Sequence, residues 1–478
     1  MNLKQKAISG VKWNTTATIV LTLLQILRLA VLTRLLDKSD FGLIAIATMV
    51  IGFTDIFSEL GLTVAVIHKQ DISDKQYSSV FWTNILLSII VFFALWGLTP
   101  FLSIFYKEPR LNTIIPLFGI QILMNGFGKM FQTIKSKNLE FAFLSKVRIV
   151  ASIVGFLITV IFAILDYGVY SLVIGQLCQV ALMQGIYTIV GRKEQTILWH
   201  LNFREIADFI KIGTFRLGSQ VLDFVSSKID IFLIGKFFGM DDLGIYNLAK
   251  DLICRPYGII NQFTSSVASS AFAQIQKDLD AVRAYYKKIL SIISSIAVPI
   301  YIITFIAADF IVRILYGPNF NEVATLLRIL TIYGIECSIS SQGSIIQVAL
   351  GRTDAGFKWT IVRIIITIGV IVAVSSMSIQ AVAYGQSLLS VISFYLFWVI
   401  AIKPIIHISF GDYIKTFSKP ILISIVLSLP ICISIYLIPE TLWSQIIGAV
   451  LFSVLLLAYY WLTQKESILQ YWQQIIKK

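Results

Sequence analysis

Residues 21–36 read LTLLQILRLAVLTRLL, an apolar run with Arg28 near its middle. About 20 such residues form a helix long enough to cross a bilayer, and similar runs recur from near Trp13 to near Leu462. The 478 residues are 57% hydrophobic and 14% charged, whereas soluble domains carry about 25% charged residues. The runs are continuously apolar and do not alternate as barrel strands do. The sequence therefore predicts an all-α integral membrane protein with about fourteen transmembrane helices.

Cysteine and histidine are too sparse and scattered to predict a metal site. The four cysteines stand singly in apolar segments, and the three histidines form no group with the spacing of metal ligands. We therefore expect no metal and no cofactor. No histidine within a span pairs with a nucleophile, and no link is long enough for a soluble domain. The chain is not expected to be an enzyme.

The basic residues follow the expected topology of a membrane protein. Although the net charge is +13, lysine and arginine gather in alternate links, as at Lys135 and Lys137 or Lys287 and Lys288. The opposite links are nearly free of them. By the positive-inside rule the basic side is cytoplasmic, and an even number of spans then places both termini in the cytoplasm. The charge thus indicates topology, with attraction to membrane lipid as a secondary effect, and no nucleic acid is expected as a partner.

The chain contains an internal repeat. RLLDKSDFGL at 34–43 resembles KFFGMDDLGI at 236–245, and VRIV at 147–150 resembles VRII at 362–365. Each half then holds six spans, so the two copies have the same orientation and an axis along the membrane normal relates them. The expected architecture is two six-helix lobes plus two C-terminal helices. The predicted divisions are an N-lobe at 1–190, a cytoplasmic linker at 191–211, a C-lobe at 212–402, and two extra spans with a cytoplasmic tail at 403–478.

Polar residues lie on one face of each of four spans, when positions are projected at the period of an α-helix. These residues are Thr22, Gln25 and Arg28 in the first span, Asp55 and Glu59 in the second, Arg216, Gln220, Asp223 and Asp230 in the seventh, and Asp251, Arg255 and Gln262 in the eighth. The four spans are equivalent in pairs by the repeat. Their polar faces predict a water-filled cavity between the lobes. The alternative is that the charged residues form structural ion pairs between helices, which also offsets the cost of burial.

Two segments resemble a known family. FGLIAIATMVIGFTDIFSELGLTVAVIHKQDISDKQYSSVFWTN at 41–84 and YNLAKDLICRPYGIINQFTSSVASSAFAQIQKD at 246–278 are similar to the corresponding parts of Wzx-type polysaccharide flippases. These form the polysaccharide transporter branch of the multidrug/oligosaccharidyl-lipid/polysaccharide exporter superfamily, and the resemblance is strongest to the colanic-acid exporter type. With the size, the repeat and the number of spans, the resemblance covers essentially the whole chain.

The resemblance implies a transport function in the bacterial inner membrane. Such a protein moves an undecaprenyl-diphosphate-linked oligosaccharide repeat unit to the periplasmic leaflet by alternating access of two lobes. The unit is then polymerised into O-antigen of lipopolysaccharide, exopolysaccharide or capsule. Association with a polymerase and a chain-length regulator is also implied.

The resemblance also assigns roles to the polar faces. Cations on the first and neighbouring spans of the family meet the lipid diphosphate, which points to Arg28 here, with Arg216 and Arg255 as further cations. The glycan would be bound by four polar side chains, those of Thr22, Gln25, Gln220 and Gln262. The carboxylates balance these cations or carry a coupling H⁺ or Na⁺; they are Asp55, Glu59, Asp223, Asp230 and Asp251.

Two other functions remain open from the sequence. A multidrug or organic-cation exporter of the same superfamily has the same twelve-helix core, but it predicts a cavity of acidic and aromatic residues, whereas this chain mixes arginine with its acids. A membrane enzyme of polysaccharide assembly needs a catalytic group of residues or a large extramembrane loop, and the sequence has neither.

Overall fold

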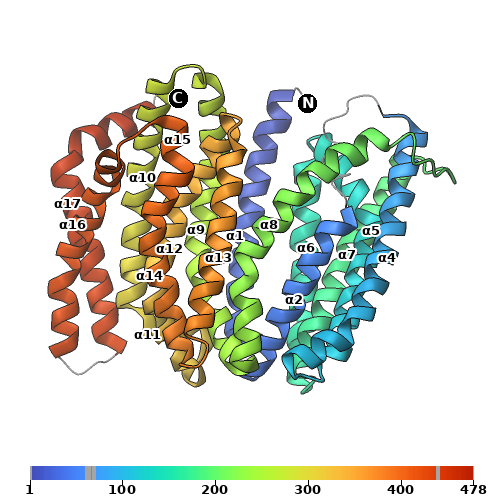
Figure 1. The fold of residues 1–478 in the computed structure, drawn as a ribbon, viewed down its shortest axis with the longest axis horizontal. Coiled ribbons are helices and arrows are strands. Elements are labelled where there is room, and N and C mark those ends of the chain that lie inside the picture. The colour runs from blue at the N-terminus through green and yellow to red at the C-terminus, as the bar shows by residue number, and fades with distance from the viewer. Residues whose placement is uncertain (1–2, 60–65, 67–71, 438–441, 477–478) are drawn as a thin grey trace. The chain divides into compact units, whose positions relative to one another are not determined.

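The computed structural model describes residues 3–59, 66, 72–437 and 442–476, and these residues form helices joined by short turns, with no strand among them (Figure 1). The prediction of an all-α fold is confirmed. Twelve helical stretches in the described part are long and apolar enough to cross a membrane. The long helices α8 (Ala207–Phe237) and α9 (Gly239–Ile275) are not among the twelve, and both carry several charged residues. The predicted number of about fourteen transmembrane helices therefore stays a prediction.

The chain divides into two compact units. Unit 1 contains Met1–Asn247 with Leu315–Gly317, and unit 2 contains Leu248–Ile314 with Pro318–Lys478. This division rests on contacts within the chain, whereas the domain ranges given above rest on the repeat and stay a prediction.

Unit 1 is built from the helices of the first half of the chain together with α8. These helices are α1 (Leu3–Leu32), α2 (Lys38–Glu59), α4 (Asp74–Tyr106), α5 (Leu111–Lys137), α6 (Phe141–Ile164), α7 (Val169–Glu194) and α8. α5 packs between α4 and α7, α7 also packs on α6, and α1 lies along α6. Small residues allow these close approaches: Gly191 of α7 faces the ring of Phe131 on α5, and Gly10 of α1 faces Phe141 of α6.

Apart from Leu315 and Tyr316, unit 2 takes up most of α9 and the helices that follow. They are α10 (Leu279–Ile306), α11 (Ala308–Tyr316), α12 (Asn321–Ala349), α13 (Thr353–Ala373), α14 (Ile379–Phe397), α15 (Lys403–Ile406), α16 (Phe410–Leu437) and α17 (Leu442–Ile476). Here α12 packs between α10 and α14, and α14 also packs on α13. The order α10–α12–α14–α13 is the order α4–α5–α7–α6 of unit 1, which is the pattern that an internal repeat predicts. The symmetry axis itself stays a prediction.

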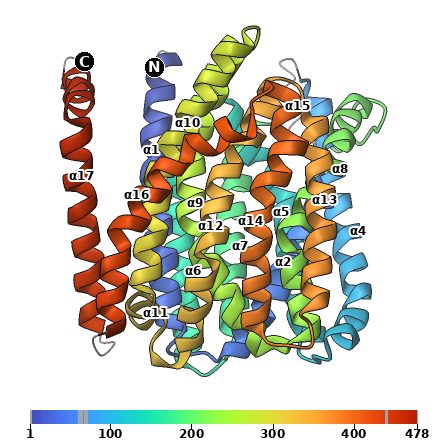
Figure 2. The same cartoon turned by 60° about the vertical axis from the view of Figure 1, so that its left-hand side comes forward.

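The two C-terminal helices pack on the outer side of α10 within unit 2. α16 lies along α10 and α17 lies against α16, as Figure 2 shows. Prolines at positions 420 and 430 lie inside α16. Each removes a backbone N–H from the helical ladder and favours a bend.

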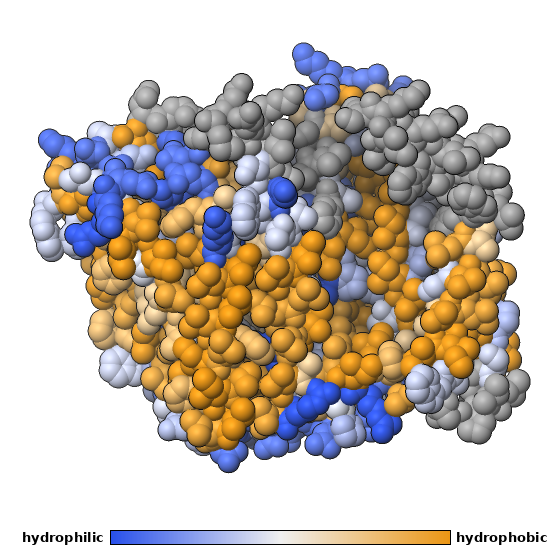
Figure 3. All heavy atoms as spheres, turned by 180° about the vertical axis from the view of Figure 1, so that it is seen from behind, coloured by the Kyte–Doolittle hydropathy of each residue, from blue (hydrophilic) through white to orange (hydrophobic). Residues whose placement is uncertain are grey.

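Apolar side chains cover the middle of the helices on the face drawn in Figure 3, and hydrophilic side chains gather toward the helix ends. Large apolar residues are exposed to an extent that is unusual for soluble proteins: Ile104 is 77% exposed and Trp96 is 52% exposed. Such a surface is stable when lipid covers it. The chain is a multi-pass membrane protein.

Candidate functional site

Arg28 lies on α1, in a helical stretch that qualifies as a membrane span from Lys12 to Leu32. Its side chain is half-buried, as is that of Thr22, while Gln25 is exposed. Arg28 forms no hydrogen bond or ion pair with any residue whose side chain the structure describes. A guanidinium in a span costs about 2.5–3.5 kcal/mol on insertion scales. Among the described residues, therefore, no acidic side chain forms an ion pair with this arginine.

The helices that carry Asp55 and Asp223 are neighbours in unit 1. Phe53 of α2 packs on Phe224 of α8 with ring centroids 5.8 Å apart, and Gly235 faces Ile46 further along the pair. Residue numbers rise along α2 as they fall along α8, so the two helices run antiparallel. Asp55 therefore lies on the same side of the Phe53–Phe224 contact as Gln220. Asp55 and Gln220 are half-buried and Asp223 is exposed.

Asp230 has a different environment from the other candidate carboxylates. It is 5% exposed. Its Oδ2 accepts a hydrogen bond of 2.9 Å from the hydroxyl of Tyr246, and its Oδ1 accepts one of 2.9 Å from the backbone N–H of Ile231. The bond from Tyr246 ties α8 to the first turns of α9 within unit 1, whereas the bond from Ile231 lies within α8. Asp230 thus has a structural role, and its predicted part in ion coupling stays a prediction.

The candidates of unit 2 lie on α9. Nη2 of Arg255 lies 2.5 Å from Oδ2 of Asp251, one helical turn earlier, so the guanidinium is paired within its own helix. The Arg255 side chain is 15% exposed and that of Asp251 is 48% exposed. Gln262, two turns further on, is exposed. A pair of this kind can be exchanged for an anionic ligand at small cost, because i,i+4 ion pairs are weak.

The side chains of Glu59 and Arg216 lie outside the described residues, so their predicted roles stay predictions. In the described part of the chain, no group of three or more histidine, cysteine, aspartate or glutamate residues could hold a metal ion.

The sequence analysis missed a buried carboxylate on α12. Glu336 is 1% exposed, and its Oε2 lies 3.7 Å from Nη2 of Arg363 on α13. The signal was present: Glu336, Ser340, Gly343 and Gln347 recur at i, i+4, i+7 and i+11 and so lie on one face of the helix. The helix α12, which is the tenth span in the predicted count of fourteen, therefore carries a polar face like those of the first, second, seventh and eighth spans.

Comparison with known proteins assigns this chain to a family. Residues 31–325 match the family described as "Polysaccharide biosynthesis protein". The chain belongs to this family. The resemblance seen in the two quoted segments is thereby confirmed at the level of the family.

Two relatives extend over almost the whole chain. The chain is 25% identical over 426 residues to the lipopolysaccharide biosynthesis protein WzxC of Escherichia coli K12, covering 89% of this chain and 87% of that protein. It is 26% identical over 425 residues to the teichuronic acid biosynthesis protein TuaB of Bacillus subtilis 168, covering 88% of each. The two relatives are named for the biosynthesis of two different polymers, lipopolysaccharide and teichuronic acid.

Solved structures support the fold. The lipid II flippase MurJ in an inward closed conformation superposes with a TM-score of 0.77 at 15% identity, covering 95% of this chain and 99% of that chain. A multidrug resistance transporter of the MATE family in its inward-facing conformation superposes with a TM-score of 0.57 at 13% identity, covering 81% and 96%. At these identities the likeness concerns the fold alone.

Proposed function

We propose that the chain moves an undecaprenyl-diphosphate-linked oligosaccharide repeat unit across the bacterial inner membrane, for export of a surface polysaccharide. Membership of the polysaccharide biosynthesis family supports a role in making a polysaccharide. WzxC and TuaB are named for the biosynthesis of lipopolysaccharide and of teichuronic acid, and MurJ, which has the same fold, is named as a lipid II flippase. The direction is from the cytoplasmic to the periplasmic leaflet, since the sugar unit is assembled before it is polymerised outside.

The observation that carries the proposal is Arg28, a guanidinium within a span and without a described partner. A lipid diphosphate carries about two negative charges and several acceptor oxygens, which the guanidinium fork can bind in a bidentate manner. Thr22 and Gln25 lie on the same face of α1 and offer polar groups to the sugar hydroxyls. The polyprenyl chain needs no site of its own if it stays in the bilayer.

Alternating access belongs to the same proposal. It requires a cavity between two lobes that opens to one leaflet at a time, and the repeated neighbour order of helices supports two lobes of equal construction. Both termini are then cytoplasmic. The carboxylates Asp55 and Asp223 are the proposed carriers of a coupling H⁺ or Na⁺, or of charge that balances the empty site. A polymerase and a chain-length regulator are proposed partners on the family resemblance alone.

A multidrug exporter is the second candidate, because MATE transporters superpose on the chain. Arg28 argues against it, since a fixed cation in the transport path repels organic cations and attracts phosphate. An enzymatic role finds no support in the relatives, of which those with solved structures are named as flippases and transporters.

The experiment that tests the proposal is complementation of a flippase-deficient bacterial strain at matched membrane levels of protein. The variants are Arg28→Ala and Arg28→Lys, with Leu23→Ala as the control, because Leu23 is an exposed apolar residue of the same helix. Removing one partner of a desolvated charge pair costs about 2–5 kcal/mol, and 1.4 kcal/mol corresponds to a tenfold change.

We expect Arg28→Ala to lower surface polysaccharide at least tenfold and to leave lipid-linked oligosaccharide in the cytoplasmic leaflet. Arg28→Lys keeps the charge but loses the fork, so we expect partial activity, and Leu23→Ala should match the wild type. Full activity of Arg28→Ala would show that Arg28 does not bind the diphosphate. Failure of the wild-type protein to restore polysaccharide in strains with several different repeat units would count against the function itself.

A further inference from the structure

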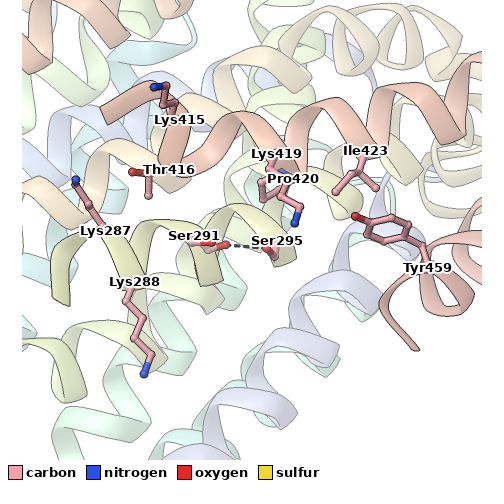
Figure 4. Close-up of a pocket in the computed structure, with 10 residues that line it drawn as sticks. All are labelled: Lys287, Lys288, Ser291, Ser295, Lys415, Thr416, Lys419, Pro420, Ile423 and Tyr459. Atoms are coloured by element: carbon pink, nitrogen blue, oxygen red, sulfur yellow. Dashed lines mark hydrogen bonds between the residues drawn. The ribbon is translucent and has the colours of Figure 1, made fainter. Parts of the chain in front are cut away.

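A cavity of about 400 Å³ lies between α10 and α16 of unit 2 and reaches α17 (Figure 4). Four lysines line it: Lys287 and Lys288 from α10, and Lys415 and Lys419 from α16. Three hydroxyl-bearing side chains from α10 and α16 also contribute to the lining; they are Ser291, Ser295 and Thr416. None of these residues belongs to the polar faces discussed above.

The four lysines line one cavity because of their positions on the two helices. Lys288, Ser291 and Ser295 lie on one face of α10, at i, i+3 and i+7, and Lys415 and Lys419 are one turn apart on α16. In Figure 4 Lys419 extends from α16 into the space between Ser295 of α10 and Tyr459 of α17, whereas the ammonium groups of Lys288 and Lys415 point away from that space. Of the four lysines, Lys419 is therefore the one placed to meet a ligand in that space.

The positive charge of the cavity is mostly unbalanced within the described part of the chain. Lys287 lies 3.7 Å from a carboxylate oxygen of Asp412, a weak contact between partly exposed groups. Lys288, Lys415 and Lys419 form no hydrogen bond or ion pair through their ammonium groups with any described residue. The nearby Arg283 is paired with Asp280 at 2.7 Å, so that pair adds no net charge. Among the described residues the four lysines thus have one carboxylate partner between them, and this excess of positive charge favours an anionic ligand.

The surface next to the cavity indicates which kind of anion fits. Lys415, Lys419, Leu422 and Val426 recur at i, i+4, i+7 and i+11 and so share one face of α16. Leu422 is 60% exposed and Val426 is 63% exposed. By the positive-inside rule the lysine end of this face lies at the cytoplasmic surface, and the apolar end then lies in the hydrocarbon layer. A soluble phosphate would use only the first part of this surface, whereas a phospholipid would use both.

We propose that this cavity binds the phosphate of an anionic phospholipid from the cytoplasmic leaflet, with Lys419 at the phosphate and the acyl chains along Leu422 and Val426. Basic pockets between transmembrane helices on the cytoplasmic side bind anionic head groups in this way. The serine and threonine hydroxyls provide additional donors to the head group. The proposal does not depend on the transport activity, because no residue that lines the cavity is among the candidate transport residues.

The test uses full-length protein purified in detergent, stripped of lipid and then titrated with phosphatidylglycerol or phosphatidylcholine, with bound lipid counted by native mass spectrometry. The variants are Lys419→Gln and the triple variant Lys288→Gln/Lys415→Gln/Lys419→Gln. The matched control is Lys193→Gln/Lys277→Gln/Lys358→Gln, which removes the same charge from exposed lysines that do not line the cavity. Thermal melting of each protein verifies that it is folded.

We expect the wild type and the matched control to prefer phosphatidylglycerol about tenfold or more over phosphatidylcholine. Lys419→Gln should weaken this preference several-fold, and the triple variant should abolish it. Equal binding of the two lipids by the wild type, or an unchanged preference in a folded triple variant, overturns the proposal. If the triple variant does not fold, Lys419→Gln decides in the same way.

Two competition arms distinguish the source of the phosphate. Inorganic diphosphate at millimolar concentration should leave phosphatidylglycerol bound, because it lacks the acyl chains; complete displacement would assign the cavity to a soluble anion. Undecaprenyl diphosphate should compete no better than phosphatidylglycerol at equal concentration. If it displaces the phospholipid at a small fraction of that concentration, the cavity is a substrate site and the proposal is wrong.

Discussion

Gly42 of α2 packs directly against the backbone carbonyl of Met240 in the first turn of α9: a methyl group at position 42 would lie 2.0 Å from that oxygen. The contact has a counterpart, since a methyl group on Gly244 would lie 2.1 Å from the carbonyl oxygen of Lys38 in the first turn of α2. Both contacts lie within unit 1. Each helix thus uses a glycine to approach the backbone of the other, a known role of small residues at helix interfaces.

The two contacts are equivalent under the sequence repeat. Adding the offset of 202 residues to Lys38 and Gly42 gives Met240 and Gly244. The two repeat copies of the motif therefore meet each other through the same pair of positions, in exchanged roles. This reciprocity is what an approximate twofold relation between the copies requires, and it explains why glycine occupies the matching position of both motifs.

The first prediction concerns this contact. Gly42→Ala should destabilise the protein by about 1–3 kcal/mol, the usual cost of overpacking, because backbone atoms cannot move aside as a flexible side chain can. We expect a melting temperature lower by several degrees in detergent. Gly97→Ala is the control, since position 97 is in the interior of α4 and no heavy atom lies within 4 Å of the added methyl group. An equal melting temperature for Gly42→Ala and the wild type would contradict the close contact.

The second prediction concerns the buried ion pair of α12 and α13. Arg363→Met leaves Glu336, at 1% exposure, without its cation, and an uncompensated buried charge costs about 3–5 kcal/mol. Glu336→Gln should cost less, because the Arg363 side chain is 26% exposed and can reach the interface. The double variant Glu336→Gln/Arg363→Met should recover most of the loss. The measurement is a double-mutant cycle on thermal stability in detergent, and additive effects would show that the two residues do not interact.

Much of the fold could be predicted from hydropathy alone. Long apolar runs define helices such as α4 and α6, and the helical period places Thr22, Gln25 and Arg28 on one face without any structure. The repeat between 34–43 and 236–245 is likewise visible in the letters of the sequence. These features depend on residues close together along the chain, which is why they could be predicted.

Partners across helices could not be predicted. Asp230 was a candidate for ion coupling because it lies in a span, but its bond to the Tyr246 hydroxyl depends on how α9 folds back beside α8. That turn is made at Gly239, whose φ of 84° favours glycine. The pairing of Glu336 with Arg363 depends in the same way on the packing of α12 against α13. The hydropathy pattern predicts which face of a helix is polar, but it does not predict which residue of another helix lies opposite that face.

The third prediction concerns Lys135, whose side chain is 5% exposed. Its Nζ donates to Glu140 at 2.9 Å and to Glu194 at 2.6 Å, which joins the ends of α5 and α7. Either Glu140→Gln or Glu194→Gln alone leaves one carboxylate, so each should cost about 1 kcal/mol or less. The double variant leaves a buried ammonium without an anion and should cost about 3 kcal/mol or more. Thermal melts of the wild type, the two single variants and the double variant test this cooperativity. If the loss of stability in the double variant equals the sum of the two single losses, the two carboxylates act independently.

The fourth prediction concerns the pH dependence of the link between α4 and α5. Glu108 accepts hydrogen bonds from Nε of Arg110 at 2.9 Å and from Nη2 at 3.0 Å. These bonds hold the pKa of Glu108 below its usual range and raise the pKa of Arg110. Because the folded-state pKa of the carboxyl is lowered, its contribution to stability is present above the unfolded pKa of about 4.3 and is lost as the pH falls through the lowered value.

We therefore expect the difference in melting temperature between the wild type and Glu108→Gln to be constant from pH 7 to about pH 5 and to shrink as the pH falls below about 4. The difference itself should be small, because the Arg110 side chain is 44% exposed and solvent screens the pair. Lys107→Gln, one residue away, serves as the control for a change of charge in the same link. A difference that grows on acidification, or one that does not depend on pH, would mean that the carboxylate does not stabilise the folded state through Arg110.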